Sequence, residues 1–364
     1  MDRIELIWMG VKIGAVVFTM LSSVPVMVWV ERRGSALMQN RLGPNRVGPL
    51  GILQAPVDVV KLLFKEDFIP AHVEKVIFVL APAVLLIPAF MTFAVVPFAG
   101  DIAIDGKALH AQIADLDVGI LYVLAISSLG VYGIIMAGWA SNNKYSMIGS
   151  LRSSAQMISY ELSLGLSVLG MIMMAESIHL RDIVAAQSGH IFGFLPRWGV
   201  FTQPIGFIVF LTASFAETNR LPFDLPEGES EIVAGYHTEY GAMKFALFFM
   251  AEYMNMLVAS ALISTLFFGG FQLLPGMGRL IDPTGALIAK FFTAGNPADW
   301  GRLALEAVSF SIKVGFFMWF FVWVRWTLPR FRYDQLMNLG WKVLFPLSLA
   351  NLVVTAALMY LRVI

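Results

Sequence analysis

Eight long apolar segments limit what this chain can fold into more than any other feature of its sequence. With soft boundaries they cover about residues 7–30, 75–98, 118–140, 155–176, 202–217, 244–270, 303–328 and 341–361. A helix crosses a bilayer with about 20 mostly apolar residues, and it satisfies its own backbone polar groups there. We therefore expect an all-α polytopic membrane protein, with eight transmembrane helices in a single membrane domain over residues 1–364.

The composition supports the same class. The chain is 58% hydrophobic and 14% charged, whereas soluble domains are roughly 45–50% apolar and about 25% charged. The net charge is zero, so nothing suggests binding to nucleic acid. The first apolar stretch is longer than the core of a signal peptide and lacks a small-residue cleavage site, so we expect it to be retained as a span.

Lysine and arginine are distributed unevenly between the two sets of loops. The loops at about residues 31–74, 141–154, 218–243 and 329–340, together with the adjoining span ends, carry fifteen of these cations, and the other loops and the termini carry eight. Cytoplasmic loops are enriched in Lys and Arg. The four loops are therefore predicted to be cytoplasmic and both termini periplasmic, in a multi-pass protein of the cell inner (plasma) membrane.

The first of these loops contains an amphipathic pattern. Gln54, Asp58, Lys61 and Lys65 recur at spacings of four, three and four residues in an otherwise apolar run. This spacing predicts a helix with a narrow polar stripe, suited to lie along the membrane interface. The pattern alone fits a surface helix without a ligand equally well.

Carboxylates are concentrated in one loop and also occur inside spans. The stretch from Ser214 to Gly241 holds six acidic residues and one arginine, Arg220. Glu161 and Glu252 lie within apolar segments, where a charge costs roughly 2.5–3.5 kcal/mol on insertion scales. Such a group faces the bundle interior, pairs with a cation or holds a proton. The alternatives are a hydrogen bond between helices for Glu161 and a solvated docking loop for the acidic stretch.

Other chemistry is less well supported by the sequence. The absence of cysteine excludes thiolate-ligated iron–sulfur clusters in this chain, and no glycine-rich dinucleotide fingerprint follows a strand. The five histidines form no i, i+4 pair, so we expect structural or solvated roles and no metal. Glu306 and Lys313 share a helix face seven residues apart and are predicted to form ion pairs that hold helices together.

Four stretches carry a family resemblance: RLGPNRVGPLGILQAPVDVVKLLFKEDFIP, GWASNNKYSMIGSLRSSAQMISYELSLGL, AETNRLPFDLPEGESEIVAGYHTEYGAMKFALFFMAEY and LPRFRYDQLMNLGWKVLFPLSL. They resemble the H subunit of bacterial NADH:quinone oxidoreductase (complex I), the counterpart of mitochondrial NADH dehydrogenase subunit 1, over nearly the whole chain and in order. The resemblance implies a quinone chamber and its membrane opening, and the start of a buried-carboxylate path that couples quinone reduction to proton pumping.

The resemblance also implies roles for individual residues. The quinone chamber and opening would involve Glu31, Arg32, Arg41, Arg46, Asp58, Lys61 and Arg332, and the proton path Glu161, Glu217, Asp224, Glu227, Glu229, Glu231 and Glu252. Quinone, either ubiquinone or menaquinone, would be the substrate. NADH, flavin and the iron–sulfur clusters would bind to the other membrane-arm and peripheral-arm subunits, which would also supply the quinone's proton donors, so no catalytic residue is expected here. For Arg33, Arg330 and Lys65 we expect anchoring to lipid phosphates.

Two alternatives remain at this stage. The chain could be the equivalent subunit of a related donor complex, such as a membrane-bound hydrogenase. It could also be a stand-alone proton-coupled transporter that uses the same carboxylates. Transporters often contain paired repeats with broken helices, and the sequence shows no internal repeat.

Overall fold

The computed structural model describes residues 3–104, 107–191, 195–225, 228, 232–288 and 296–361. Its longer helices are α1 (Arg3–Met38), α2 (Gln54–Phe64), α3 (Lys75–Phe93), α4 (Gly119–Ala140), α5 (Lys144–Ala175), α8 (Pro204–Glu217), α10 (Ala242–Phe267), α12 (Pro297–Thr327) and α14 (Phe345–Tyr360). Shorter elements are α6 (Leu180–Ala186), α7 (Gly199–Thr202), α11 (Ile281–Ile288), α13 (Tyr333–Asn338) and the antiparallel pairs β1 (Asp101–Ile104) with β2 (Lys107–His110) and β3 (His190–Ile191) with β4 (Leu195–Pro196).

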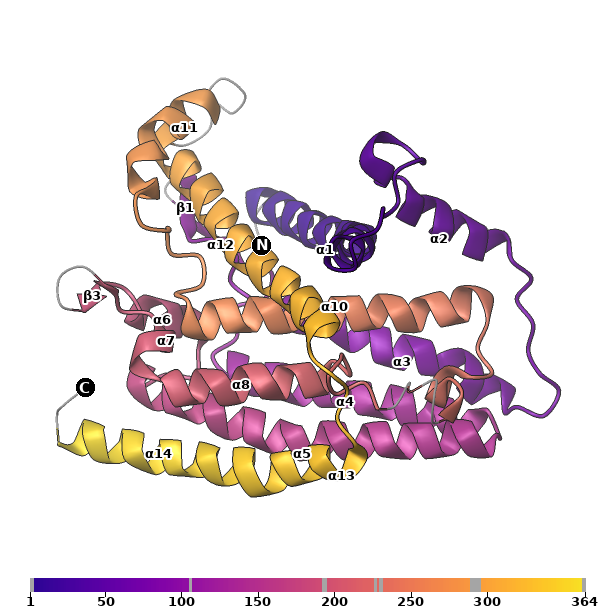
Figure 1. Ribbon diagram of the computed structural model, residues 1–364. Helices are drawn as coiled ribbons and strands as arrows, with labels where there is room; N and C mark the ends of the chain where they lie inside the picture. The colour runs from indigo at the N-terminus through magenta and orange to yellow at the C-terminus, as the bar shows by residue number, and fades with distance from the viewer. Residues whose placement is uncertain are drawn as a thin grey trace.

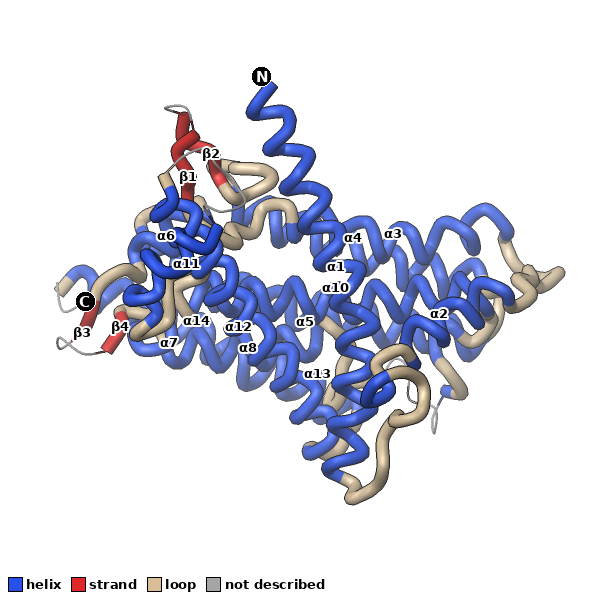
Figure 2. Tube along the Cα trace, turned by 90° about the horizontal axis from the view of Figure 1, so that it is seen from above, coloured by secondary structure: helices blue, strands red, loops and turns tan. Residues whose placement is uncertain are grey.

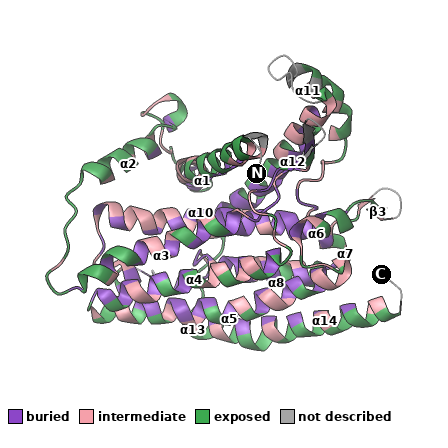
Figure 3. Ribbon diagram, turned by 180° about the vertical axis from the view of Figure 1, so that it is seen from behind, coloured by how far each residue is buried: buried purple, intermediate pink, exposed green. Residues whose placement is uncertain are grey.

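Most of the long helices run side by side, whereas α1 and α12 are strongly inclined to them (Figure 1). Within the described residues, seven helices are long and apolar enough to cross a membrane, and α8, with 14 residues, is shorter. These helices make the chain an integral membrane protein. Helices α1 and α2 are largely exposed, whereas α10 and α5 carry extensive buried faces (Figure 3).

Polar as well as apolar contacts hold the bundle together. The side chain of Gln203, just before α8, accepts a hydrogen bond from Asn351 Nδ2 at 2.9 Å and donates one to Thr355 Oγ1 at 2.8 Å, both on α14. Buried side-chain hydrogen bonds between helices are useful where lipid offers no alternative partner. These hydrogen bonds hold α14 against the rest of the bundle. Little of α14 is otherwise buried.

The structure changes the boundaries of several expected elements. Helix α5 begins at Lys144, so most of the loop predicted at residues 141–154 is helical. Asn143 caps this helix by accepting a hydrogen bond from the Tyr145 backbone N–H at 2.9 Å. Its first turns bury serines, including Ser146 and Ser150, and this polar composition hid the helix from a search for apolar runs.

Of the other expectations, one is confirmed and one is wrong, and some elements were not predicted. The amphipathic helix is confirmed as α2, and in the view from above it lies over the bundle, near α10 (Figure 2). The β1–β2 hairpin and α6 were not predicted. The predicted ion-pair role for Lys313 is wrong, because its Nζ donates to the backbone carbonyls of Gly270 and Gln272 at 2.9 and 2.8 Å. Glu306 instead pairs with Arg302 on its own helix at 2.8 Å.

Candidate functional site

A cavity of about 390 Å³ lies between α1, α2 and α10. This volume is within the range of small-molecule sites, which are mostly apolar with a few placed polar groups. Its apolar walls include Val24, Pro25 and Val28 of α1, Ala55, Val59 and Leu62 of α2, and Ala246, Phe249 and Met250 of α10. Its polar lining consists of Glu31, Arg32, Asp58, Tyr253 and Arg325. The cavity thus offers a long apolar surface beside a small charged patch.

Glu31 is the centre of that charged patch. Its carboxylate is buried and accepts hydrogen bonds from Arg220 Nη1 at 3.0 Å, Arg325 Nη1 at 2.5 Å and Tyr253 Oη at 2.8 Å. These partners come from the loop after α8, from α12 and from α10. A carboxylate held by two guanidinium groups and a phenol is strongly favoured as the anion.

Arg220 connects Glu31 to a second carboxylate. Its Nε lies 2.5 Å from Glu252 Oε1, and its guanidinium carbon lies 4.3 Å from the centre of the Tyr253 ring. Its side chain is only 3% exposed. Burial alone lowers the pKa of Arg220, but Glu252 and Glu31 outweigh it and raise the pKa above its ordinary value. Arg220 therefore stays charged, and its removal would leave the buried Glu252 carboxylate without its cation.

Asp224 lies beside this cluster and has its own cation. Arg330 Nη2 donates to Asp224 Oδ2 at 3.1 Å. Burial raises the pKa of Asp224, and the neighbouring Arg330, Arg325 and Arg220 oppose that rise. Arg330, which is expected to anchor lipid, thus pairs with a buried acid of the same chain. Arg33, for which the same anchoring is expected, donates to the Leu50 carbonyl at 3.1 Å.

A polar contact between α1 and α2 lies at the rim of the cavity. Arg32 Nη1 donates to Asp58 Oδ2 at 2.5 Å, and Gln54 Nε2 donates to the other oxygen of Asp58 at 2.9 Å. The two charged side chains are 45% and 32% exposed. Because an exposed pair contributes only about 0.2–1 kcal/mol, this contact positions α2 and can also be broken easily.

A second, much smaller cavity lies further along α10. It has a volume of about 40 Å³ and is lined by Ser127, Glu217 and Asn255 among others. Ser127 is a hydrogen-bond partner of the Glu217 carboxyl, and Glu161 of α5 is close enough to act on it electrostatically. A space of this size holds at least one water. Asn255 is three residues beyond Glu252, so one turn of α10 separates the small cavity from the charged cluster.

The structure brings together only part of the residue set expected from the sequence. Glu31, Arg32 and Asp58 line the large cavity, and Glu252 and Asp224 belong to the charged cluster beside it. Glu217 lines the small cavity, and Glu161 is near enough to act on it electrostatically. Arg41, Arg46, Lys61 and Arg332 are exposed and do not line either cavity. Glu227, Glu229 and Glu231 lie outside the described residues.

Three residues of the cluster were missed. Arg220 was treated as a loop residue and Arg325 as a topology marker, although Arg220 is the one arginine among six loop acids and Arg325 lies in an apolar segment. Such isolated cations are themselves a signal of buried pairing. Tyr253 carried no such signal, because tyrosine is an ordinary residue near the ends of membrane helices.

Comparisons with known proteins agree with this architecture. The profile of the NADH dehydrogenase family matches residues 11–356. The H subunit of NADH-quinone oxidoreductase from Bdellovibrio bacteriovorus is 46% identical, over 99% of this chain and 98% of its own length. This chain belongs to the NADH dehydrogenase family, among the H subunits of NADH-quinone oxidoreductase.

Other members of the family are similarly close. NADH-quinone oxidoreductase subunit 8 of Rhodothermus marinus is 49% identical over 97% of both chains. The H subunit numbered 2 of Geobacter sulfurreducens is 48% identical over 95% of this chain and 94% of its own length. The chain is therefore a subunit of the enzyme complex NADH-quinone oxidoreductase, with the other subunits of that complex as partners. A stand-alone transporter has no support from these comparisons.

Proposed function

We propose that this chain forms the quinone chamber and its membrane opening in a proton-translocating NADH:quinone oxidoreductase of the cell inner membrane. It is also proposed to start the carboxylate path that couples quinone reduction to pumping. Quinone itself is the substrate class named by the relatives. The observation that carries the proposal is the 390 Å³ cavity, which is apolar along most of its length and meets Glu31 and Arg325 at one side.

The lining of this cavity suits a quinone. An isoprenoid tail needs an apolar surface, and α1, α2 and α10 supply one. A quinone ring needs hydrogen-bond donors, which Tyr253 and the two arginines Arg32 and Arg325 provide at the polar side. Since α1 and α2 are mostly exposed in this chain, a hydrophobic molecule can reach the cavity from the bilayer between them (Figure 3).

The charged cluster supplies a physical route from quinone to the membrane interior. Negative charge developing on a reduced quinone near Arg325 competes with Glu31 for that cation, and Glu31 shares Arg220 with Glu252. One turn further along α10, Asn255 reaches the cavity that holds Glu217, and Glu217 interacts with Glu161. A change of charge at the quinone can therefore alter proton binding along this row of carboxylates.

Filling the cavity tests the proposal. In the intact complex, Ala246→Trp places a large side chain inside the cavity, whereas Ala125→Trp adds the same bulk at an exposed position on α4. Ala246→Trp should abolish most quinone reduction while NADH oxidation by a water-soluble acceptor, which does not use the quinone site, continues. Ala125→Trp should leave both rates unchanged. Normal quinone reduction in an assembled Ala246→Trp complex would contradict the proposed chamber.

A further inference from the structure

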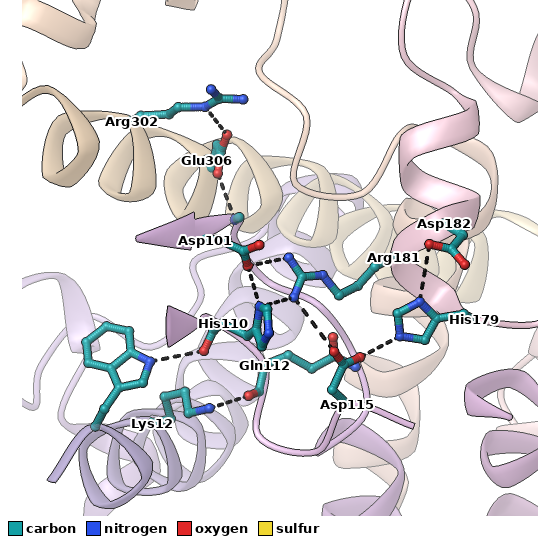
Figure 4. Close-up of polar contacts among 12 residues, drawn as sticks. Lys12, Asp101, His110, Gln112, Asp115, His179, Arg181, Asp182, Arg302 and Glu306 are labelled. Carbon is teal, nitrogen blue, oxygen red and sulfur yellow. Dashed lines mark hydrogen bonds and ion pairs between the residues drawn. The ribbon is translucent and has the colours of Figure 1, made fainter. Parts of the chain in front are cut away.

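A second cluster of charged side chains lies far from the cavity, at the end of the bundle that contains the β1–β2 hairpin. Figure 4 shows it: Asp101, His110, Asp115, His179, Arg181 and Asp182 converge there from the hairpin, the loop after it and the start of α6. The Lys and Arg distribution predicts that this end faces the periplasm. Neither the quinone cavity nor the carboxylate path uses these residues, and we call them the outer cluster.

His179 is held between two carboxylates. Its Nε2 lies 2.5 Å from Asp115 Oδ1, and its Nδ1 lies 3.4 Å from Asp182 Oδ1. Asp182 also accepts a hydrogen bond from Ser177, and Arg181 lies 3.9 Å from the other oxygen of Asp115. Partial burial works to lower the pKa of His179, but Asp115 and Asp182 outweigh it and raise that pKa. The imidazole therefore binds its proton more strongly here than in water.

His110 has two partners that exclude one another. Its Nδ1 lies 2.8 Å from Asp101 Oδ1 and 2.5 Å from Arg181 Nη1. One ring nitrogen either carries a hydrogen, which it donates to Asp101, or presents a lone pair, which accepts from Arg181. Arg181 also contacts Asp101 directly. Through Arg181 the ring joins the hairpin to α6, whereas through Asp101 it joins the two strands of the hairpin.

The outer cluster is attached to the outer end of α1. Trp8 Nε1 donates to the His110 backbone carbonyl at 3.0 Å, and Lys12 Nζ donates to the Gln112 carbonyl at 2.5 Å. The negative charge of Asp115 also attracts the Lys12 ammonium group. Since α1 is otherwise poorly buried and lines the quinone cavity further along, the outer cluster is one of the few fixed points of this helix.

We propose that the outer cluster is a pH-sensitive clasp that fastens the β1–β2 hairpin, and with it the outer end of α1, to α6 when the periplasmic side becomes acidic. In the acidic state His179 is charged and pairs with Asp115 and Asp182. At higher pH its imidazole loses that charge, and the contacts between the loop after the hairpin and α6 weaken. Because α1 also lines the cavity, a change in pH at the clasp alters the hold on this helix and so affects the cavity; this last step alone rests on the proposed function.

The sign of the pH effect follows from His179. A histidine whose folded pKa is raised stabilises its contacts fully below its ordinary pKa of about 6.5 and loses this contribution as the pH rises through the raised value. The clasp therefore tightens on acidification. An exposed ion pair contributes about 0.2–1 kcal/mol, so protonation of His179 should change the local opening equilibrium by up to about fivefold.

Hydrogen–deuterium exchange of the intact complex in lipid nanodiscs tests the clasp. Peptides covering β1, β2 and α6 are compared at about pH 6 and about pH 8, with exchange times corrected for the intrinsic pH dependence of amide exchange. The wild-type chain should be up to about fivefold better protected at the lower pH. His179→Gln should remove this difference. His190→Gln, at an exposed histidine of the neighbouring strand β3 outside the outer cluster, should retain all of it.

Three results would overturn the clasp: protection that does not depend on pH in the wild-type chain, a difference that His179→Gln retains, or a difference that His190→Gln removes as well. The readout does not involve quinone, so it remains decisive if the quinone site proves to lie elsewhere. The connection to α1 is read separately, from peptides covering its outer turns. These should follow the hairpin in pH dependence, and their independence of it would refute the connection.

Discussion

Replacing Arg220 by methionine is the most informative change to the charged cluster. The substitution keeps much of the side-chain volume and removes the charge that Glu252 contacts at 2.5 Å. Glu31 retains Arg325 at 2.5 Å and Tyr253 at 2.8 Å, so Glu252 is the carboxylate that loses its direct partner. Leaving one member of a buried pair uncompensated costs about 3–5 kcal/mol.

That magnitude determines whether Glu252 is protonated in the Arg220→Met complex. An ordinary glutamate with a pKa of about 4.3 prefers the ionised form roughly 500-fold at pH 7. A penalty of about 3–5 kcal/mol is worth between about a hundredfold and several thousandfold in the same equilibrium. The two effects are comparable, so a substantial fraction of Glu252 in the Arg220→Met complex should hold a proton at neutral pH.

Infrared spectroscopy of the purified complex measures this directly. Arg220→Met should show a protonated-carboxyl C=O band that the wild-type complex lacks, and the double variant Arg220→Met/Glu252→Gln should lose it. Arg46→Met, at an exposed arginine, is the matched control and should show no new band. Absence of the band in an assembled Arg220→Met complex, or its persistence in the double variant, would refute the pairing of Arg220 with Glu252.

Three further changes test other parts of the structure. Arg32→Ala breaks the contact with Asp58 at the cavity rim and should weaken binding of a quinone-site inhibitor by up to about fivefold; an unaltered inhibitor titration would count against a role for this rim. Glu161→Gln keeps the shape of the side chain but cannot exchange a proton, so it should slow both quinone reduction and proton pumping, and unchanged rates would indicate a structural role. Gly133→Ala would bring a Cβ within 2.7 Å of the Leu85 backbone nitrogen, so the free energy of unfolding should fall by about 1–3 kcal/mol, read from the thermal denaturation of the complex. Gly315→Ala, whose Cβ would meet no atom of the described residues outside its own helix within 4 Å, is the control and should leave that free energy unchanged.

The sequence predicts the fold best where a single physical signal is strong. Apolar length identifies the long helices, and the spacing of Gln54 and Asp58 predicts α2. The signal fails where polar residues are buried by other helices, as with Ser146 and Ser150 at the start of α5. It also gives no information on the β1–β2 hairpin, because that short turn is stabilised mainly by contacts with α6 and α1.

The site shows a similar division. Carboxylates in or near spans are conspicuous, so Glu31, Glu161, Glu217 and Glu252 could be found without coordinates. Their partners could not be, because pairing depends on how helices pack. Arg220 is 189 residues from Glu31 in the chain, and Arg325 is 294 residues away. For the same reason Lys313 and Glu306, which share one helix face, do not pair with each other: Lys313 donates to backbone carbonyls, and Glu306 pairs with Arg302.

The claim on which the account depends most is that quinone occupies the cavity between α1, α2 and α10. A photoreactive quinone analogue with a full isoprenoid tail, illuminated in the intact membrane complex, tests it directly. The account predicts labelled peptides from residues 24–32, 55–62 and 243–253, with labelling suppressed by excess natural quinone. Competable labelling of this chain that is confined to other segments would contradict it.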